Sequence, residues 1–220
     1  MKLLSYVYNL GAFILKGFKA KSVKDFYDSA AVNYNDAMKM QDYLVGIIIE
    51  RMPECDAALD LGVGTGITSY HMRKKCNTLV SVDFSDGMIN EGRKRLGLEA
   101  NILKCNFLEL PLTDNSIEVA ASTGAVRHIP AASYGKFFLE VYRVVNGCFI
   151  TEARDFTYLE KGYYKAYGKL MGLLGHSEQP LNSDKNRLEK VLTDSGFEAR
   201  FEKIKPNSRN YVAIARKNRH

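Results

Sequence analysis

Three alternating glycines follow an acidic residue in the segment Asp60-Leu61-Gly62-Val63-Gly64-Thr65-Gly66, and this segment constrains the fold more than any other. The apolar residues 57–59 before it predict a buried strand, and residues 67–72 after it can begin a helix. A strand, a glycine turn and a helix form the first half of a nucleotide-binding crossover in a doubly wound α/β fold. Glycine suits the turn because it tolerates positive φ and lets a ligand approach the backbone closely.

The carboxylate of Asp60 narrows the class of ligand. A dinucleotide would place its pyrophosphate over this turn, where a carboxylate at the strand end repels it. A ligand that carries a sulfonium and an ammonium group instead tolerates the negative charge. We therefore expect Asp60, Gly62, Gly64 and Gly66 to belong to a site for such a cofactor.

A second acid, Asp83, ends the β-branched segment 78–83, which predicts the next strand. In a doubly wound sheet the carboxyl end of the second strand lies beside the first, where a carboxylate can accept both hydroxyls of a ribose. The alternative is that Asp83 caps the helix that begins near Ser85. Because Ser85 can provide that cap itself, we favour the ribose role.

The ordered motifs resemble those of class I S-adenosylmethionine-dependent methyltransferases, and most closely the small-molecule branch that includes quinone-biosynthesis enzymes. The resemblance spans residues 26–152 and is carried by residues 60–66, 82–89, 104–112, 114–122 and 126–129. It implies S-adenosylmethionine as the cofactor. The contacts that it implies for this cofactor are Asp60, Gly62, Gly64, Gly66, Asp83, Phe84, Met88, Asn106, Phe107 and Ser122.

Three departures from the family pattern bear on the site. Asn106 stands where the family usually has the Asp that receives the adenine amino group, and an Asn oxygen can accept the same hydrogen bond without charge. Arg127 replaces the usual first His of the turn after the fourth strand. The turn before the fifth strand is shortened to Asn146-Gly147. We interpret these departures as divergence within an active fold.

The alternation of strand and helix patterns predicts an α/β fold, a doubly wound, seven-stranded sheet that is mostly parallel, and the resemblance implies an antiparallel closing strand. The predicted strands are residues 56–61, 78–83, 100–105, 117–122, 147–152, 197–204 and 211–215, and the predicted helices are 23–33, 41–52, 66–76, 85–96, 131–145 and 184–195. Residues 1–220 are expected to form one domain, with 1–36 as a helical cap in which Phe26-Tyr27-Asp28 and Tyr34-Asn35-Asp36 resemble the family's cofactor-covering segment. The aromatic and Met-rich insertion 154–182 is either core packing or a lid over the substrate.

Methyl transfer is an in-line displacement at an activated carbon, so the protein mainly aligns the reactants and excludes water. A general base is needed only if the acceptor loses a proton. His128 is the first candidate for this catalytic role because its ordinary pKa suits neutral pH. The alternative is a turn residue that packs below the cofactor. Glu152, Asp155 and His176 are weaker candidates.

Composition limits the partners and the compartment. The four cysteines are scattered, with no Cys-x-x-Cys pair and no His at metal spacing, so we expect no metal site and a cytoplasmic protein. Residues 1–24 contain five lysines and no acid, together with an apolar stripe at Leu3, Val7, Leu10, Ile14 and Phe18. This segment suits either peripheral contact with a lipid surface or packing on the protein's own core.

The sequence thus predicts methyl transfer to a small apolar or amphipathic acceptor, such as a quinone precursor, a phenol or a lipid. A nucleic-acid substrate is disfavoured because the basic residues are concentrated at the two termini, while residues 25–202 are acidic overall. Two alternatives remain open, an RNA methyltransferase and a catalytically silent module that binds S-adenosylmethionine. The sequence makes no prediction of the oligomeric state.

Overall fold

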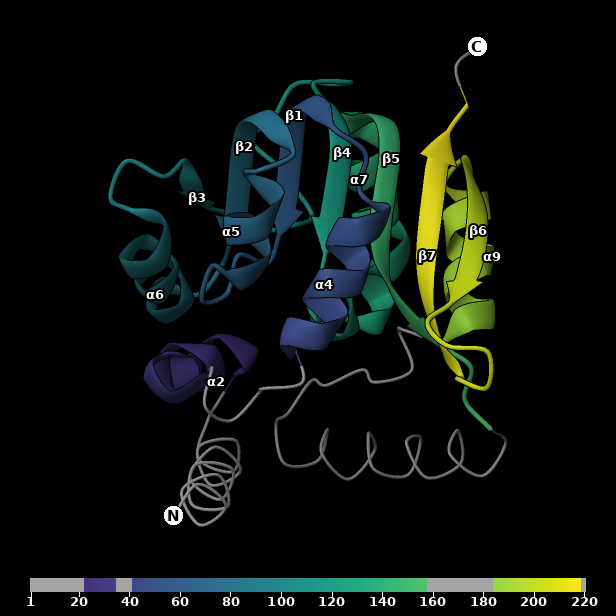
Figure 1. Ribbon diagram of the computed structural model, residues 1–220, viewed down its shortest axis with the longest axis horizontal. Helices are drawn as coiled ribbons and strands as arrows, with labels where there is room; N and C mark the ends of the chain where they lie inside the picture. The colour runs from purple at the N-terminus through teal and green to yellow at the C-terminus, as the bar shows by residue number, and fades with distance from the viewer. Residues whose placement is uncertain (1–21, 35–40, 158–183, 219–220) are drawn as a thin grey trace.

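The computed structural model describes residues 22–34, 41–157 and 184–218. Its seven strands form one sheet in the order β3-β2-β1-β4-β5-β7-β6 (Figure 1). The strands are β1 (Cys55–Leu61), β2 (Cys76–Asp83), β3 (Ile102–Lys104), β4 (Ile117–Ser122), β5 (Val145–Arg154), β6 (Phe197–Lys203) and β7 (Asn210–Lys217). Neighbouring strands among β1–β5 are parallel, whereas β7 runs antiparallel to both β5 and β6. The predicted fold class, including the antiparallel closing strand, is confirmed.

The helices follow the predicted pattern with shorter bounds. They are α2 (Val23–Ala30), α4 (Gln41–Arg51), α5 (Ile67–Met72), α6 (Asp86–Leu96), α7 (Tyr134–Val144) and α9 (Lys185–Asp194), with short 3₁₀ turns η1 (Ala31–Asn33), η2 (Val126–His128) and η3 (Ala131–Ser133). The helix predicted over 66–76 ends at Met72 because β2 already begins at Cys76. Gly196, with φ of 98°, terminates α9, as its position after the helix predicts.

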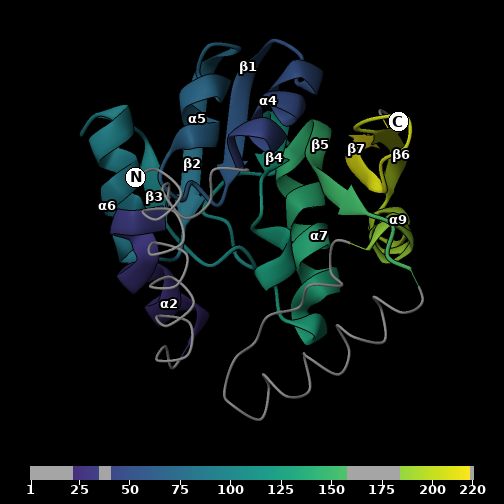
Figure 2. The same cartoon turned by 60° about the horizontal axis from the view of Figure 1, so that its bottom comes forward.

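The sheet is covered on both faces, which is why its central strands carry apolar residues without alternation. On one face α7 and α9 bury Phe137, Phe138 and Leu188 against β5 and its neighbours. On the other face α4 and α5 bury Ile48 and Met72. Helix α6 packs beside α5 at the β2–β3 end of the sheet (Figures 1 and 2).

The carboxyl ends of β1–β5 point to one edge of the sheet, and α2 lies beyond this edge, against α6 (Figures 1 and 2). Of the predicted cap 1–36, residues 22–34 are described, whereas most of the predicted lid 154–182 and the stripe in residues 1–18 lie outside the described residues. None of the helices in the described ranges is long and apolar enough to cross a membrane.

Candidate active site

A cavity of about 700 Å³ lies at the carboxyl edge of the sheet, beneath α2. Its wall is formed by α2, the glycine turn after β1, the segments that follow β2 and β3, and the turn after β4. The predicted site residues that line it are Gly62, Gly64, Asp83, Phe84, Met88, Asn106, Phe107 and His128. Asp60, Gly66 and Ser122 lie outside its lining, so the structure brings eight of the eleven predicted residues together around one space.

The glycine turn presents its backbone to the cavity because two of the residues that line it, Gly62 and Gly64, have no side chain. Gly62, Gly64 and Gly66 all adopt positive φ, with values of 95°, 49° and 82°. A Cβ built on Gly62 would lie 2.6 Å from the Cβ of Ala125, in the turn after β4. Glycine is therefore required at Gly62 both for its backbone conformation and for the close approach of these two turns.

The Asp83 carboxylate links the glycine turn after β1 to the segment that follows β2. Its Oδ1 accepts hydrogen bonds from the backbone N–H groups of Phe84 (2.8 Å) and Ser85 (3.0 Å), and its Oδ2 accepts from that of Gly64 (2.9 Å). The side chain of Ser85, not that of Asp83, caps α6 by accepting from the Met88 N–H at 3.1 Å. Burial raises the pKa of Asp83, although these three backbone hydrogen bonds act to lower it. Asp83 Oδ2 keeps capacity for one further donor.

Asp60 lies behind the turn and does not face the cavity. Its side chain is fully buried, and Oδ2 accepts a 2.5 Å hydrogen bond from Ser69 Oγ, which in turn lies 2.8 Å from Ser81 Oγ. Burial raises the pKa of Asp60 to about 7. A carboxyl group that is partly protonated at neutral pH is a weaker negative charge than we expected from the sequence, and its hydrogen bond with Ser69 joins the end of β1 to α5.

The segment after β3 supplies an aromatic wall. Phe107 is buried and meets Phe84 edge to face, with ring centroids 6.1 Å apart. The Oδ1 of Asn106 accepts the N–H of Leu108 at 3.0 Å, which fixes the loop and leaves the amide –NH₂ of Asn106 as a donor. The oxygen that we expected to receive an adenine amino group thus has one hydrogen bond within its own turn and keeps a second lone pair for a further donor.

His128 is joined to the covering helix by a hydrogen bond that the sequence analysis did not predict. Its Nε2 lies 2.6 Å from the phenol oxygen of Tyr27 and accepts from Arg127 Nε at 3.2 Å. Because Nε2 accepts from Arg127, the phenol must be the donor. Burial and the Arg127 charge lower the pKa of His128 to about 3. The imidazole is therefore neutral, but it is a weak base, and its lone pair is occupied.

Ser122 and Glu152 support the wall without lining it. Ser122 is fully buried and donates to the Leu61 carbonyl at 3.0 Å, which ties β4 to β1. Glu152 Oε1 accepts the N–H of Gly124 at 2.8 Å, so it anchors the turn after β4. Burial raises the pKa of Glu152. Asp155 lies beyond the end of β5, outside the cavity lining, and His176 is outside the described residues.

Two polar atoms on cavity-lining residues lack a hydrogen-bond partner within the described part of the chain. They are Thr123 Oγ1 and His128 Nδ1. Buried polar atoms in this state favour a polar ligand, because an unsatisfied buried group costs about 1–3 kcal/mol. Over the same described ranges, no cluster of three or more His, Cys, Asp or Glu side chains is arranged to hold a metal ion.

Comparison with known proteins identifies relatives of the central part of the chain. Residues 58–147 match a protein family described as "Methyltransferase domain". The chain is 25% identical over 117 residues to a malonyl-[acyl-carrier protein] O-methyltransferase of Hamiltonella defensa, an alignment that covers 52% of this chain and 45% of the relative. It is 30% identical over 90 residues to a demethylmenaquinone methyltransferase of Corynebacterium kroppenstedtii, covering 41% of this chain and 37% of the relative. The chain thus spans less than half the length of these two relatives.

Solved structures share the fold over most of the chain. A methyltransferase of Thermotoga maritima described as dependent on S-adenosylmethionine superposes with a TM-score of 0.64 at 20% identity, covering 85% of this chain and 96% of the other. The magnesium protoporphyrin IX methyltransferase of Synechocystis, solved with bound S-adenosylhomocysteine, superposes with a TM-score of 0.58 at 14% identity and covers 86% of each chain.

Proposed function

Because this chain belongs to the class I S-adenosylmethionine-dependent methyltransferases, we propose that its 700 Å³ cavity binds S-adenosylmethionine and an apolar or amphipathic acceptor. One observation carries the proposal. The open glycine turn, the Asp83 carboxylate and the Phe84–Phe107 wall come from three different βα connections and line the same space.

The residues present fit this cofactor. Gly62 and Gly64 leave room for its methionine part, Asp83 Oδ2 has capacity for a ribose hydroxyl, and Phe84, Met88 and Phe107 offer an apolar slot for adenine. Thr123 Oγ1 and His128 Nδ1 are available to polar groups of the ligands. The bound cofactor supplies a methyl group that its sulfonium activates.

The protein's own contribution is orientation and exclusion of water. Tyr27 closes the cavity from α2 by donating its phenol hydrogen to His128 Nε2. We assign His128 the role of a hydrogen-bond acceptor for this closure, in place of the general base that its sequence position suggested. A pKa of about 3 makes the imidazole a poor match for proton abstraction near neutral pH.

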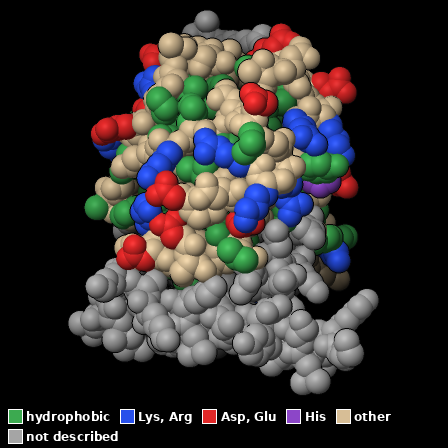
Figure 3. All heavy atoms as spheres, turned by 90° about the vertical axis from the view of Figure 1, so that its left-hand side faces the viewer, with side chains coloured by type: hydrophobic (Ala, Val, Ile, Leu, Met, Phe, Trp, Pro, Cys, Tyr) green, Lys and Arg blue, Asp and Glu red, His purple; other side chains and the backbone are tan. Residues whose placement is uncertain are grey.

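Apolar residues of the cavity lining support the acceptor class that we propose. Tyr34, Val45, Ile129 and Pro130 are among them and offer apolar surface. Relatives of this chain are named for lipid-like acceptors, among them a 24-methylenesterol C-methyltransferase of Arabidopsis thaliana and the demethylmenaquinone enzyme. These observations support a small apolar or amphipathic acceptor. On the face where α6 and β3 lie, acidic and basic side chains are interspersed (Figure 3), which is unlike the basic surface typical of an RNA-binding protein.

Titration calorimetry with S-adenosylmethionine and S-adenosylhomocysteine tests cofactor binding. We expect binding below millimolar concentration and a loss of about 1–3 kcal/mol in Asp83→Ala. Asp56→Ala, an exposed acid at the opposite end of β1, is the control and should bind normally. If neither ligand binds the wild type, the enzyme function is abandoned in favour of a scaffold.

A radiolabelled methyl donor incubated with lipid, small-metabolite and RNA extracts tests the acceptor class. We expect label in an apolar small-molecule fraction. Label in RNA alone would replace the small-molecule proposal with an RNA methyltransferase. Cofactor binding without label in any fraction would favour the silent binding module.

We further propose that residues 1–24 make peripheral contact with an anionic lipid surface. The support is the sequence pattern of five lysines, no acid and an apolar stripe. Each lysine near such a surface contributes attraction of about 1 kcal/mol, which weakens with salt. This contact would bring the cavity close to the membrane in which lipid-like acceptors are dissolved.

A further inference from the structure

Helix α2 is attached to the rest of the protein by consecutive side chains that reach opposite sides of the cavity. Tyr27 bonds to His128 in the turn after β4, while Asp28 reaches the amino end of α6, next to the segment that follows β2. Lys24 and Tyr27 also line the cavity. The covering helix α2 thus contacts both the turn after β4 and the amino end of α6 directly.

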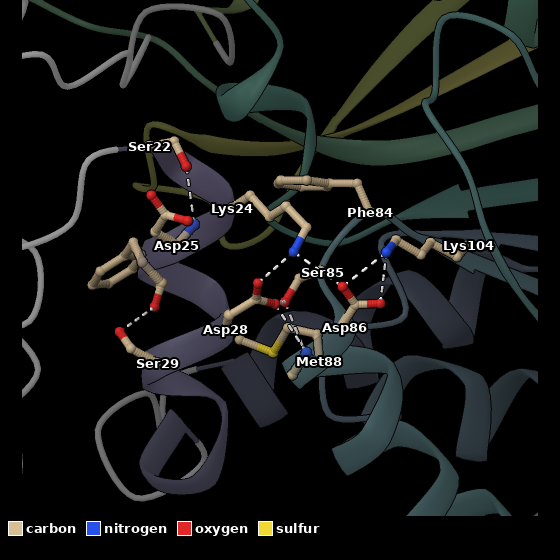
Figure 4. A network of polar contacts seen from close by, with 12 residues as sticks. Ser22, Lys24, Asp25, Asp28, Ser29, Phe84, Ser85, Asp86, Met88 and Lys104 are labelled. Carbon is tan, nitrogen blue, oxygen red and sulfur yellow. Dashed lines mark hydrogen bonds and ion pairs between the residues drawn. The ribbon is translucent and has the colours of Figure 1, made fainter.

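Asp28 completes the amino end of α6 from outside that helix. Its Oδ1 accepts from Ser85 Oγ at 2.6 Å and from the Gly87 N–H at 2.9 Å, and its Oδ2 accepts from Lys24 Nζ at 2.5 Å (Figure 4). A free N–H at the first turn of a helix requires such an acceptor, and a negative charge there is favoured by the helix dipole. Ser85 itself is fully buried, so its hydroxyl depends on protein partners.

These hydrogen bonds continue from α2 to the glycine turn. Ser85 donates its side-chain proton to Asp28 and its backbone N–H to Asp83 Oδ1, and Asp83 Oδ2 accepts the N–H of Gly64. Asp28 and Ser85 are 57 positions apart in sequence, and Gly64 is 19 positions from Asp83. The covering helix is therefore connected through Ser85, by a chain of hydrogen bonds, to the residues proposed to bind ribose and methionine.

The packing leaves little freedom in this contact. A Cβ built on Gly87 would lie 2.6 Å from the carbonyl oxygen of Asp28 and 2.7 Å from its Cα, so α2 rests directly on the backbone of α6. Asp86, in the first turn of α6, pairs with Lys24 at 3.0 Å and with Lys104 at 2.8 Å (Figure 4). Both ion pairs are exposed, so each contributes little to stability. They nevertheless hold the first turn of α6, where Asp28 also binds.

We propose that Asp28 is a positioning residue of the cofactor site, which couples closure of α2 to the geometry of the Asp83–Gly64 side of the cavity. The proposal rests on the proposed function only in naming the ligand. When α2 moves away, the Gly87 N–H and the Ser85 hydroxyl lose their acceptor. Ser85 is the residue that holds both the Met88 N–H and Asp83, so the adenine and ribose sides of the cavity loosen together.

The first test needs no ligand. Amide hydrogen exchange is compared in the full-length wild type, in Asp28→Asn and in the control Asp25→Asn. Asp25 lies on the same helix, is exposed, and its carboxylate points away from α6 (Figure 4). Asp28→Asn keeps one acceptor oxygen but removes the negative charge and the acceptor for Lys24, so Gly87, Met88 and Gly64 should exchange about 3- to 10-fold faster, as expected when charge-assisted hydrogen bonds become neutral ones. The control, which removes the same charge, should match the wild type.

The second test measures the equilibrium and dissociation of S-adenosylhomocysteine. Asp28→Asn should raise its Kd about 3- to 10-fold, mainly through faster dissociation, while Asp25→Asn leaves both unchanged. Gly87→Ala, which forces α2 off α6 without altering a charge, should reproduce the effect and serves as the second variant if Asp28→Asn does not fold. Unchanged exchange at Gly64 together with unchanged Kd in the folded variant would overturn the proposal. A wild type that binds no ligand would refute the proposed function, whereas the exchange result decides the coupling independently.

Discussion

At the residue scale, the contact between Tyr27 and His128 distinguishes two roles for the histidine. A general base must be free to take a proton, whereas an acceptor for Tyr27 only needs its lone pair. We predict that His128→Gln, whose amide oxygen can accept from Tyr27, keeps most of the activity, and that His128→Ala and Tyr27→Phe lose similar amounts of cofactor affinity, about 0.5–1.5 kcal/mol each.

Calorimetry and steady-state kinetics on the single and double variants check this prediction. If the two side chains act through one hydrogen bond, the losses in Tyr27→Phe and His128→Ala will not add in the double variant. The rate should also show no inflection near pH 6.5 from His128, because its pKa is lowered to about 3. A wild-type inflection near pH 6.5 that disappears in His128→Gln would restore the general base.

The pKa of Asp60 gives a second prediction at this scale. The folded protein holds the Asp60 proton up to about pH 7, whereas the unfolded chain releases it near pH 4. Between these values the folded state binds more protons, so this residue makes the free energy of unfolding fall as pH rises. Relative to that of Asp60→Asn, the free energy of unfolding of the wild type should fall by up to about 1.4 kcal/mol per pH unit between pH 5 and 7.

Urea denaturation of the wild type and Asp60→Asn at pH 5, 6, 7 and 8 measures this difference. The difference should stop growing above about pH 7, where the folded carboxyl has ionised. Asp56→Asn, exposed on the same strand, should track the wild type. Parallel curves for the wild type and Asp60→Asn would contradict the assigned pKa.

At the element scale, the close approach of two turns makes a specific demand on Gly62. We predict that Gly62→Ala lowers the free energy of unfolding by about 1–3 kcal/mol, because it combines an unfavourable φ with a contact of 2.6 Å to Ala125. Gly135→Ala is the matched control in α7, where a Cβ meets nothing within 4 Å. It should instead stabilise the protein by about 0.5–1 kcal/mol. Thermal and urea unfolding of both variants gives the comparison, and equal effects would contradict the predicted difference.

Local sequence patterns were enough to predict the seven strands, because each is a short apolar or β-branched segment bounded by turn residues, but they did not give the order of the strands in the sheet. The patterns could not predict that Asp60 lies outside the lining of the cavity. Leu59 and Leu61 are as buried as Asp60 itself, so the strand has no alternation of apolar and polar residues from which the orientation of the Asp60 side chain could be inferred. The bond between Tyr27 and His128 was also inaccessible, since it joins residues 101 positions apart. Tyr27 was noticed only as part of a covering segment, without a partner.

At the scale of the whole molecule, the proposed lipid contact predicts a separation between binding and stability. A protein truncated to begin at Ser22 should lose sedimentation with vesicles of mixed zwitterionic and anionic lipid, yet keep its melting temperature. Vesicles of zwitterionic lipid alone, and high salt, should weaken binding of the full chain. Equal sedimentation of both proteins, or unfolding of the truncated one, would favour packing of the segment on the protein's own core.

The position of β7 between β5 and β6 has a consequence for synthesis on the ribosome. Residues 148–151 of β5 are buried in the finished sheet, but their β7 partners are made after α9 and β6. Until then β5 is an apolar strand with an open hydrogen-bonding edge, the feature that promotes pairing with other chains. The nascent protein therefore contains β1–β5 before β7 is made, and it depends on β7 to cover this edge of the sheet.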